Sequence, residues 1–283
     1  MIGVSGGGLE VRIRETHCKS VLNKSGIADW AVNCYAGCEH GCVYCYARFA
    51  TRFSHPDEPW GSFVDVKVNA PQVLAVEAEK KKIGRVFVSS VCDGWQPAEE
   101  RYGLTRQCLE ILLRRGYPVT ILTKSLLARR DFDLLVGKEG VEFGVTLTGL
   151  DDNLTRLIEP ASSLPLPRLT MLGDAKAQGL RTYAFIGPLL PDLSDREEHV
   201  LPLLRALREA GVDLVYVDRL NPRYGVWPAC RSLLTKHFPH LTEKYRRVLF
   251  DERVRKEYSW ELREMLTRVA VDLGMDGRME FCF

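Results

Sequence analysis

Short runs of β-branched and aromatic residues alternate with longer amphipathic stretches through the middle of this 283-residue chain. The short runs predict strands at 29–33, 85–91, 118–123, 141–147, 181–186 and 213–217. The stretches between them predict helices near 71–82, 104–115, 129–136, 167–178 and 195–210. Parallel strands need a crossover to join them, so this alternation predicts an α/β fold with a parallel sheet covered by helices.

Six β/α units predict a partial (β/α)6 barrel of the TIM type, open on one side, instead of the closed form with eight strands. Reactive groups of such barrels lie at the C-terminal ends of the strands, which directs attention to the residues that follow each predicted strand. We expect an N-terminal segment (1–25), the barrel (26–225) and a helical C-terminal extension (226–283). With 46% hydrophobic residues, the chain has enough apolar material for such a core.

Three cysteines, Cys38, Cys42 and Cys45, follow the first predicted strand with the spacing CxxxCxxC. Thiolates are soft donors that suit iron-sulfur clusters, and three of them can ligate three irons of a 4Fe-4S cluster. The fourth iron is then open to a small chelating molecule. A zinc site usually takes four ligands in two separated pairs, and a disulfide framework suits a short secreted chain, so this triplet favours a cluster. Tyr44 places an aromatic ring beside the site.

The net charge of +2 is too balanced to indicate nucleic-acid binding by bulk charge alone. Local clusters such as Arg246 and Arg247 could still form a basic face. No apolar run approaches the roughly 20 residues of a membrane span, and no apolar signal region begins the chain. We therefore expect no membrane association and a cytoplasmic protein, in a reducing compartment that keeps thiolates available to iron.

The cysteine motif followed by a β/α array resembles the radical S-adenosylmethionine (SAM) enzymes. Four blocks, in order between Lys19 and Asp195, resemble the branch related to spore photoproduct lyase: NCYAGCEHGCVYCYAR, SSVCDGWQPAEERYGLTRQCLEIL, TILTKSLLARRDFDLL and EPASSLPLPRLTMLGDAKAQGL. The resemblance implies a 4Fe-4S cluster and SAM as cofactors, and an external one-electron donor such as flavodoxin or ferredoxin. It also implies a 5′-deoxyadenosyl radical that abstracts a hydrogen atom from the substrate.

The resemblance further implies which side chains contact SAM. Lys124, at the end of the TILTK strand, corresponds to a lysine that contacts the methionine carboxylate. Thr146 falls where the family uses a serine or threonine toward the cofactor, and Thr148 is the alternative. Tyr44 of the cysteine loop and Ser90 of the loop after the second barrel strand belong to the same predicted set.

The loop after the second barrel strand carries the predicted catalytic residues. Asp93 matches a family aspartate, with Ser90 and Cys92 beside it. Spore photoproduct lyase uses a cysteine in this region as hydrogen donor to the product radical. Here Ser90 stands at that position and Cys92 is shifted by two residues, which leaves the return of hydrogen from a thiol open. Glu99 can equally be catalytic or a helix N-terminal acid.

Fold and cofactor do not determine the substrate. If the resemblance extends that far, the target is DNA, with a cross-linked pyrimidine pair extruded from the duplex. Side chains near the predicted mouth could stack bases and neutralise phosphates, or simply pack the loops: Trp95, Tyr102, Tyr224, Trp227, Arg101, Arg219 and Arg223. The alternatives are a peptide, RNA or small-metabolite substrate, or a non-catalytic iron-sulfur sensing or electron-transfer protein.

Overall fold

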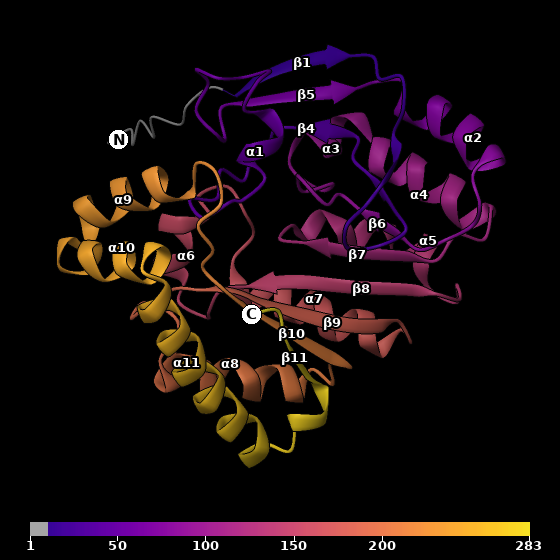
Figure 1. Ribbon diagram of the computed structural model, residues 1–283. Coiled ribbons are helices and arrows are strands. Elements are labelled where there is room, and N and C mark those ends of the chain that lie inside the picture. The colour runs from indigo at the N-terminus through magenta and orange to yellow at the C-terminus, as the bar shows by residue number, and fades with distance from the viewer. Residues whose placement is uncertain (1–10) are drawn as a thin grey trace, which may run out of the picture.

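Six strands run parallel side by side through the centre of this mixed α/β protein, whose computed structural model describes residues 11–283 (Figure 1). Each strand pairs in parallel with its neighbour, in the order β10-β9-β8-β7-β6-β3. Their bounds are β3 Trp30–Val32, β6 Val86–Val88, β7 Val119–Thr123, β8 Val141–Leu147, β9 Arg181–Leu189 and β10 Leu214–Arg219. A large parallel sheet is therefore present, consistent with a radical SAM type of partial barrel.

Two further strands extend this sheet at its edges. β2 (Leu22–Lys24) pairs antiparallel with β3, and β11 (Met279–Phe281) pairs parallel with β10. The alternation pattern did not predict them, because three residues are too few to show a period of two. β11 also brings the end of the expected helical extension into the main sheet, so that segment is not purely helical. Of the expected N-terminal segment, residues 1–10 lie outside the described residues.

A small second sheet leads into the cysteine loop. It contains β1 (Arg12–Thr16), β5 (Phe63–Lys67) and β4 (Tyr35–Ala36) in the order β1-β5-β4. Directly after β4, Gly37 has a φ of +89°, and a Cβ at this position would overlap the Phe63 carbonyl oxygen. Only glycine allows the chain to turn so closely past β5 into the cysteine loop.

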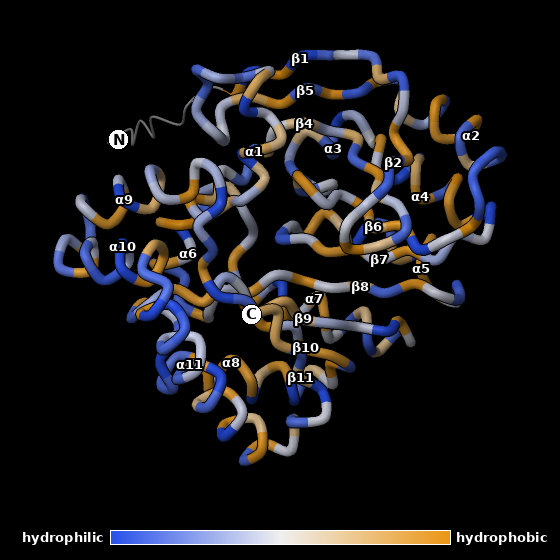
Figure 2. The backbone as a smooth tube through the Cα atoms, viewed as in Figure 1, coloured by the Kyte–Doolittle hydropathy of each residue, from blue (hydrophilic) through white to orange (hydrophobic). Residues whose placement is uncertain are grey.

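The helices cover the sheet with amphipathic faces, and in Figure 2 the tubes of helices such as α4 and α11 alternate between hydrophobic and hydrophilic residues. Helix α4, for example, buries its Leu109 and Leu112 side against the core. The predicted helix at 129–136 is instead a 3-10 helix (Leu126–Asp131) followed by the short α5. The helices are α1 Arg48–Thr51, α2 Ala70–Lys80, α3 Ala98–Tyr102, α4 Leu104–Arg114, α5 Phe132–Leu135, α6 Asp152–Ile158, α7 Pro165–Ala177, α8 Glu197–Glu209, α9 Val226–His237, α10 Thr242–Phe250 and α11 Glu252–Asp272.

A second, smaller core lies beside the cysteine loop. It forms where α6, α9 and α10 meet the ends of β9 and β10, with Ile158, Leu234 and Leu249 among its buried residues. Val43 and Tyr44 pack against it. The C-terminal helices thus contribute directly to the wall behind the cysteines. None of the helices within residues 11–283 has both the length and the apolar character needed to cross a bilayer.

Candidate active site

The three cysteines lie on one short, tightly turned loop between β4 and α1. Backbone hydrogen bonds from Gly41 N to the Cys38 carbonyl and from Cys45 N to the Cys42 carbonyl, both 3.2 Å, shape its two turns. Cys38 and Cys42 are buried, and Cys45 is half-buried. The loop therefore gathers its thiols on the protein interior instead of presenting them to solvent.

Burial dominates the electrostatics of the thiols, and their charges affect one another. Burial raises the pKa of Cys38 well above its usual value, and the charges of Asp93, Cys42 and Cys45 add to the effect. Burial raises the pKa of Cys42 to about 12, although Lys124 acts in the opposite direction. Within residues 11–283, no three or more His, Cys, Asp or Glu side chains form a site for a single metal ion. Three neighbouring soft sulfur donors suit three irons of a 4Fe-4S cluster.

Lys124 follows β7 and lies next to these cysteines. Its Nζ is 6.0 Å from the centroid of the Tyr44 ring, and in the described chain no carboxylate oxygen lies within 4 Å of it. Burial opposes its charge, but the negative charges of Cys42 and Glu159 outweigh burial and raise the Lys124 pKa. A half-buried ammonium with no carboxylate at contact distance can accept the carboxylate of a ligand.

Asp93 anchors the strand end that carries Lys124. Its Oδ1 accepts hydrogen bonds from Thr123 Oγ1 at 2.8 Å and Trp95 N at 3.0 Å. Its Oδ2 accepts one from Lys124 N at 2.8 Å and lies 3.4 Å from His40 Nδ1. The side chain is only 6% exposed. Both carboxylate oxygens thus accept hydrogen bonds from the protein, as expected for a residue that anchors the end of β7. A direct catalytic role for Asp93 stays a prediction.

Ser90 and Cys92 occupy the loop after β6, beside the cysteines. Asn33 Nδ2 donates to Ser90 Oγ at 3.3 Å, and the Tyr46 hydroxyl donates to the Ser90 carbonyl at 2.5 Å. The Cys92 thiol lies 3.5 Å from the Tyr35 carbonyl oxygen, and burial raises its pKa to about 12. The thiol of Cys92 is therefore held against the backbone in this arrangement, and its role as hydrogen donor stays a prediction.

Strand register places Thr146 at the end of β8, beside the end of β7 that leads into Lys124, and Thr148 follows directly after β8. Thr146 pairs with Phe185 and Gly144 with Tyr183, and paired residues of parallel strands project to the same face. Thr146 alternates with Val145 and shares the face of Gly144, whereas Thr148 lies just beyond the end of β8; both threonines are buried. The register of β7 with β8 pairs Leu122 with Gly144, which puts Lys124, two residues later, on this face as well.

Sequence reasoning missed a buried charged pair that supports the cysteine loop. Glu159 and Arg168, both at most 1% exposed, form an ion pair. Glu159 also accepts hydrogen bonds from the Tyr44 hydroxyl and from Ser162 Oγ. Burial disfavours the charged carboxylate, but Arg168 and Lys124 outweigh it and lower the Glu159 pKa. A sequence signal existed, since Arg168 falls on the apolar face of α7.

Two of the other predicted residues lie inside the core. Trp95 is fully buried, with its indole N–H donating to Asp131 at 2.7 Å, which supports the alternative that it packs the loop instead of stacking bases. Its large apolar ring fills space beneath the site. Glu99 is also fully buried and accepts from the Tyr35 hydroxyl, Arg130 and two backbone N–H groups. The carboxylate thus has the contacts of an internal structural acid.

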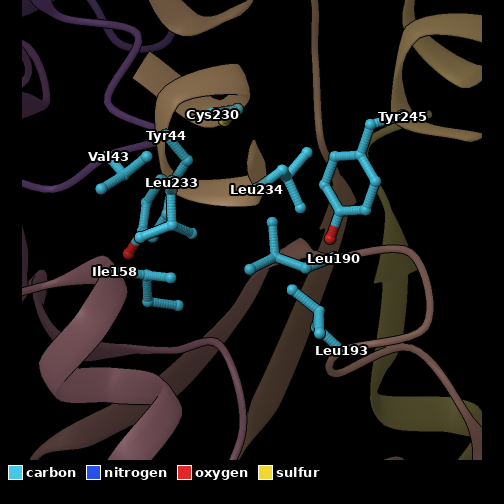
Figure 3. A pocket seen from close by; sticks show the side chains of 9 residues that line it. All are labelled: Val43, Tyr44, Ile158, Leu190, Leu193, Cys230, Leu233, Leu234 and Tyr245. Carbon is cyan, nitrogen blue, oxygen red and sulfur yellow. The ribbon is translucent and has the colours of Figure 1, made fainter. Parts of the chain in front are cut away.

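A small apolar cavity lies directly behind the cysteine loop (Figure 3). Figure 3 shows the Tyr44 ring entering it from the loop, opposite side chains of the C-terminal helices. Its lining residues come from the loop, α6, the segment after β9, α9 and α10: Val43, Tyr44, Ile158, Leu190, Leu193, Cys230, Leu233, Leu234 and Tyr245. The rear of the loop therefore has an apolar wall that excludes water.

The sequence matches the family model of the radical SAM superfamily over residues 32–217, which run from the last residue of β3, through the cysteine loop and strands β6 to β9, to Val217 of β10. The chain belongs to this superfamily. The superfamily implies an iron-sulfur cluster and SAM, and the three clustered thiols beside Lys124 fit those cofactors.

Two sequence relatives share most of the chain. An uncharacterized protein of Methanocaldococcus jannaschii is 36% identical over 190 residues, covering 66% of this chain and 71% of the relative. An uncharacterized protein of Mycobacterium tuberculosis is 33% identical over 252 residues, covering 84% of this chain and 74% of the relative.

Solved structures of spore photoproduct lyase share the fold of this radical SAM protein. The lyase complexed with dinucleoside spore photoproduct superposes with a TM-score of 0.67 at 16% identity, over 96% of this chain and 82% of that chain. A variant with bound AdoMet and the same dinucleoside gives 0.66 at 15% identity, with the same coverage. At such low identity the likeness shows a common fold alone.

Proposed function

We propose that this protein uses a 4Fe-4S cluster held by Cys38, Cys42 and Cys45, together with SAM, to abstract a hydrogen atom from a nucleic-acid substrate. When bound, the two cofactors supply a 5′-deoxyadenosyl radical. The observation that carries the proposal is Lys124: a half-buried ammonium beside the cysteine loop, with no carboxylate of the described chain within 4 Å. It is a ready partner for the methionine carboxylate of SAM.

The other residues position the cofactors and exclude water. Asp93 holds the backbone of Lys124, while Thr146 lies at the end of β8 and Thr148 follows directly after it. Ser90 borders the same space from the loop after β6. The apolar wall behind the loop keeps solvent from the rear of the cluster, which limits quenching of a reactive species (Figure 3).

A nucleic-acid substrate is supported by the exposed aromatic residues around α1. Tyr46 and Phe49 stack with their centroids 6.4 Å apart, and both are exposed. Phe53 is 85% exposed, and the Arg52 guanidinium lies 4.4 Å from its ring centroid. Exposed rings next to arginine guanidinium groups can stack bases and contact phosphates. Tyr224 adds a further exposed ring on the loop before α9, which approaches α1 where Gly225 faces Arg48.

DNA photoproduct reversal is the specific reaction to test first, since spore photoproduct lyase shares this fold. The protein would be reconstituted anaerobically with iron and sulfide, reduced with dithionite and given SAM. Formation of 5′-deoxyadenosine would be measured with ultraviolet-irradiated DNA, undamaged DNA, RNA or no substrate. Stimulation by irradiated DNA alone supports photoproduct reversal, and stimulation by RNA alone moves the substrate class to RNA. No 5′-deoxyadenosine despite an intact cluster supports the sensing or electron-transfer alternative.

Lys124→Ala tests the SAM site within the same assay. We expect a large loss of SAM affinity with unchanged iron content and cluster absorbance, because the side chain contacts the ligand and no thiol is altered. Lys138→Ala is the matched control: this exposed lysine precedes β8 and therefore lies at the opposite end of the sheet. An unchanged affinity in Lys124→Ala would contradict the assigned role.

A further inference from the structure

Arg168 makes an unusually complete set of buried contacts at the base of the site. Its Nη1 donates to the Thr146 carbonyl at 2.9 Å and its Nε to the Ser163 carbonyl at 2.7 Å. Its Nη2 contacts Glu159 and lies 2.6 Å from Ser162 Oγ. A buried ion pair is seldom retained for stability, since apolar residues of similar volume often stabilise a core as well or better. Its contacts therefore point to a role other than stability.

The contacts of Glu159 and Arg168 hold the cysteine loop in place. The second oxygen of Glu159 accepts the hydroxyl hydrogen bond of Tyr44, which lies between Cys42 and Cys45. The backbone of the cysteine loop also bonds to the end of α6 beside Glu159, since Val43 N donates to the Ile158 carbonyl at 2.8 Å. The loop is thus joined to the segment around Glu159 by both side chain and backbone.

The same segment also contacts both strand ends assigned to SAM. Ser163 N donates to the Lys124 carbonyl at 3.1 Å, and Ser163 Oγ accepts from Leu126 N at 3.0 Å. Arg168 reaches the other strand end through the carbonyl of Thr146. One buried pair is therefore connected to the cysteine loop, to the end of β7 and to the end of β8.

We propose that Glu159 and Arg168 are positioning residues that set the cysteine loop in register with Lys124 and Thr146, so that one SAM molecule can reach the open iron and the strand ends together. This inference rests on the proposed function. Neither side chain touches the reacting atoms. They act through the Tyr44 hydroxyl and through backbone carbonyls, in the way that outer-shell partners orient the ligands of a metal site.

Tyr44→Phe, Glu159→Gln and the double variant test the proposal in the reconstituted holoenzyme. Tyr44→Phe removes only the hydroxyl and keeps the ring, so it leaves the buried ion pair intact. Tyr258→Phe is the matched control, because Tyr258 also donates a half-buried hydroxyl to a carboxylate, Asp195, at 2.9 Å, but from α11. Iron content, the Kd for SAM, the change that SAM causes in the electron paramagnetic resonance spectrum of the reduced cluster, and the melting temperature are measured.

We expect each single variant to raise the Kd for SAM about tenfold, the typical cost of losing an outer-shell contact, and to weaken the spectral response to SAM. The Tyr44 hydroxyl and the Glu159 carboxylate act through the one hydrogen bond between them. The double variant should therefore bind SAM no more weakly than the single variant with the lower SAM affinity. Tyr44→Phe should keep its iron and melt like Tyr258→Phe, whose SAM binding should match the parent protein.

Three results would overturn the inference. Parent-like SAM affinity and spectra in Tyr44→Phe and Glu159→Gln would show that the contact does not position the loop. Independent, multiplying effects in the double variant would show that the two groups do not act as one unit. A parent protein that holds its cluster but binds no SAM would instead overturn the proposed function, and this inference with it.

Discussion

Replacement of Asp93 by alanine should destabilise the protein and disturb the SAM site together. The buried carboxylate accepts hydrogen bonds from Thr123 Oγ1, Trp95 N and Lys124 N, at distances from 2.8 to 3.0 Å. A buried donor left without an acceptor costs about 1–3 kcal/mol. The Thr123 hydroxyl can rotate, but the two backbone N–H groups cannot, so we expect Asp93→Ala to lower the free energy of unfolding by about 3–5 kcal/mol.

Asp93→Asn is a milder test of the same two effects. The amide keeps the volume and one oxygen acceptor, but its NH2 group faces either Lys124 N or the donors on the other side, so one hydrogen bond is lost. We expect a loss of about 1–3 kcal/mol, which corresponds to a fall in melting temperature of about 2–12 °C for a chain of this size. Because the backbone of Lys124 loses its anchor, the Kd for SAM of the reconstituted protein should also rise.

The assay combines thermal unfolding of the apoprotein with anaerobic SAM binding by the reconstituted protein. Asp152→Asn, an exposed carboxylate in the first turn of α6, is the control and should stay within about 0.5 kcal/mol of the parent protein. An Asp93→Ala protein that melts within 2 °C of the parent, by this order-of-magnitude reasoning, would refute the description of Asp93 as a buried anchor.

Three further outcomes can be measured. Cys42→Ala should abolish the cluster absorbance with only a small change in apoprotein melting, whereas Cys108→Ala, a buried cysteine on α4, should retain iron. Leu234→Ala should lower the free energy of unfolding by about 2–5 kcal/mol, because Leu234 is 1% exposed in the core beside the cysteine loop. The variant should still unfold in a single transition, at a lower temperature. A separate low-temperature transition would show that this small core unfolds independently of the main one. Burial tends to raise the pKa of Glu77, but hydrogen bonds from Leu22 N, Lys81 and neighbouring donors lower it from 4.5 to about 2. The ionised Glu77 should therefore contribute about 3 kcal/mol to the free energy of unfolding, fully above about pH 5, and this contribution should disappear as the pH falls from 4.5 toward 2. Unfolding experiments on Glu77→Gln should not show this pH-dependent loss.

The strands with a clear period of two were predicted almost to the residue. The prediction at 141–147 coincides with β8, and that at 118–123 differs from β7 by one residue. The run at 85–91 was too long, because Ser89 adopts a φ of +65° and ends β6 at Val88. A left-handed serine is rare and leaves no signal in the pattern of hydrophobic residues. The short edge strands were missed for lack of a period.

Some residues of the candidate site could be predicted from sequence motifs, and others depend on tertiary contacts that the sequence does not show. The cysteine spacing and the strand-end positions of Lys124 and Thr146 are visible in the sequence, since they depend on local order and on the parallel topology. Arg168 is marked in the sequence only by its place among the apolar residues of α7, and nothing there distinguishes Glu159 from a solvated charge. Trp95 was assigned to the mouth because an aromatic residue on a loop can face either solvent or core, and only packing decides between them.

The charges around the cysteine loop support Lys124 as the residue proposed to contact SAM. Asp93 is engaged by hydroxyl and backbone donors, and Glu159 and Arg168 neutralise each other. Among these four charged groups of the described structure, Lys124 alone has neither an opposite charge within 4 Å nor a hydrogen bond from its side chain. Isolated charges are expensive to bury, and the negative charges near Lys124 keep it protonated without satisfying its hydrogen bonds. A carboxylate ligand at this position would supply the missing contacts, and a SAM molecule that also reaches the open iron would bring one.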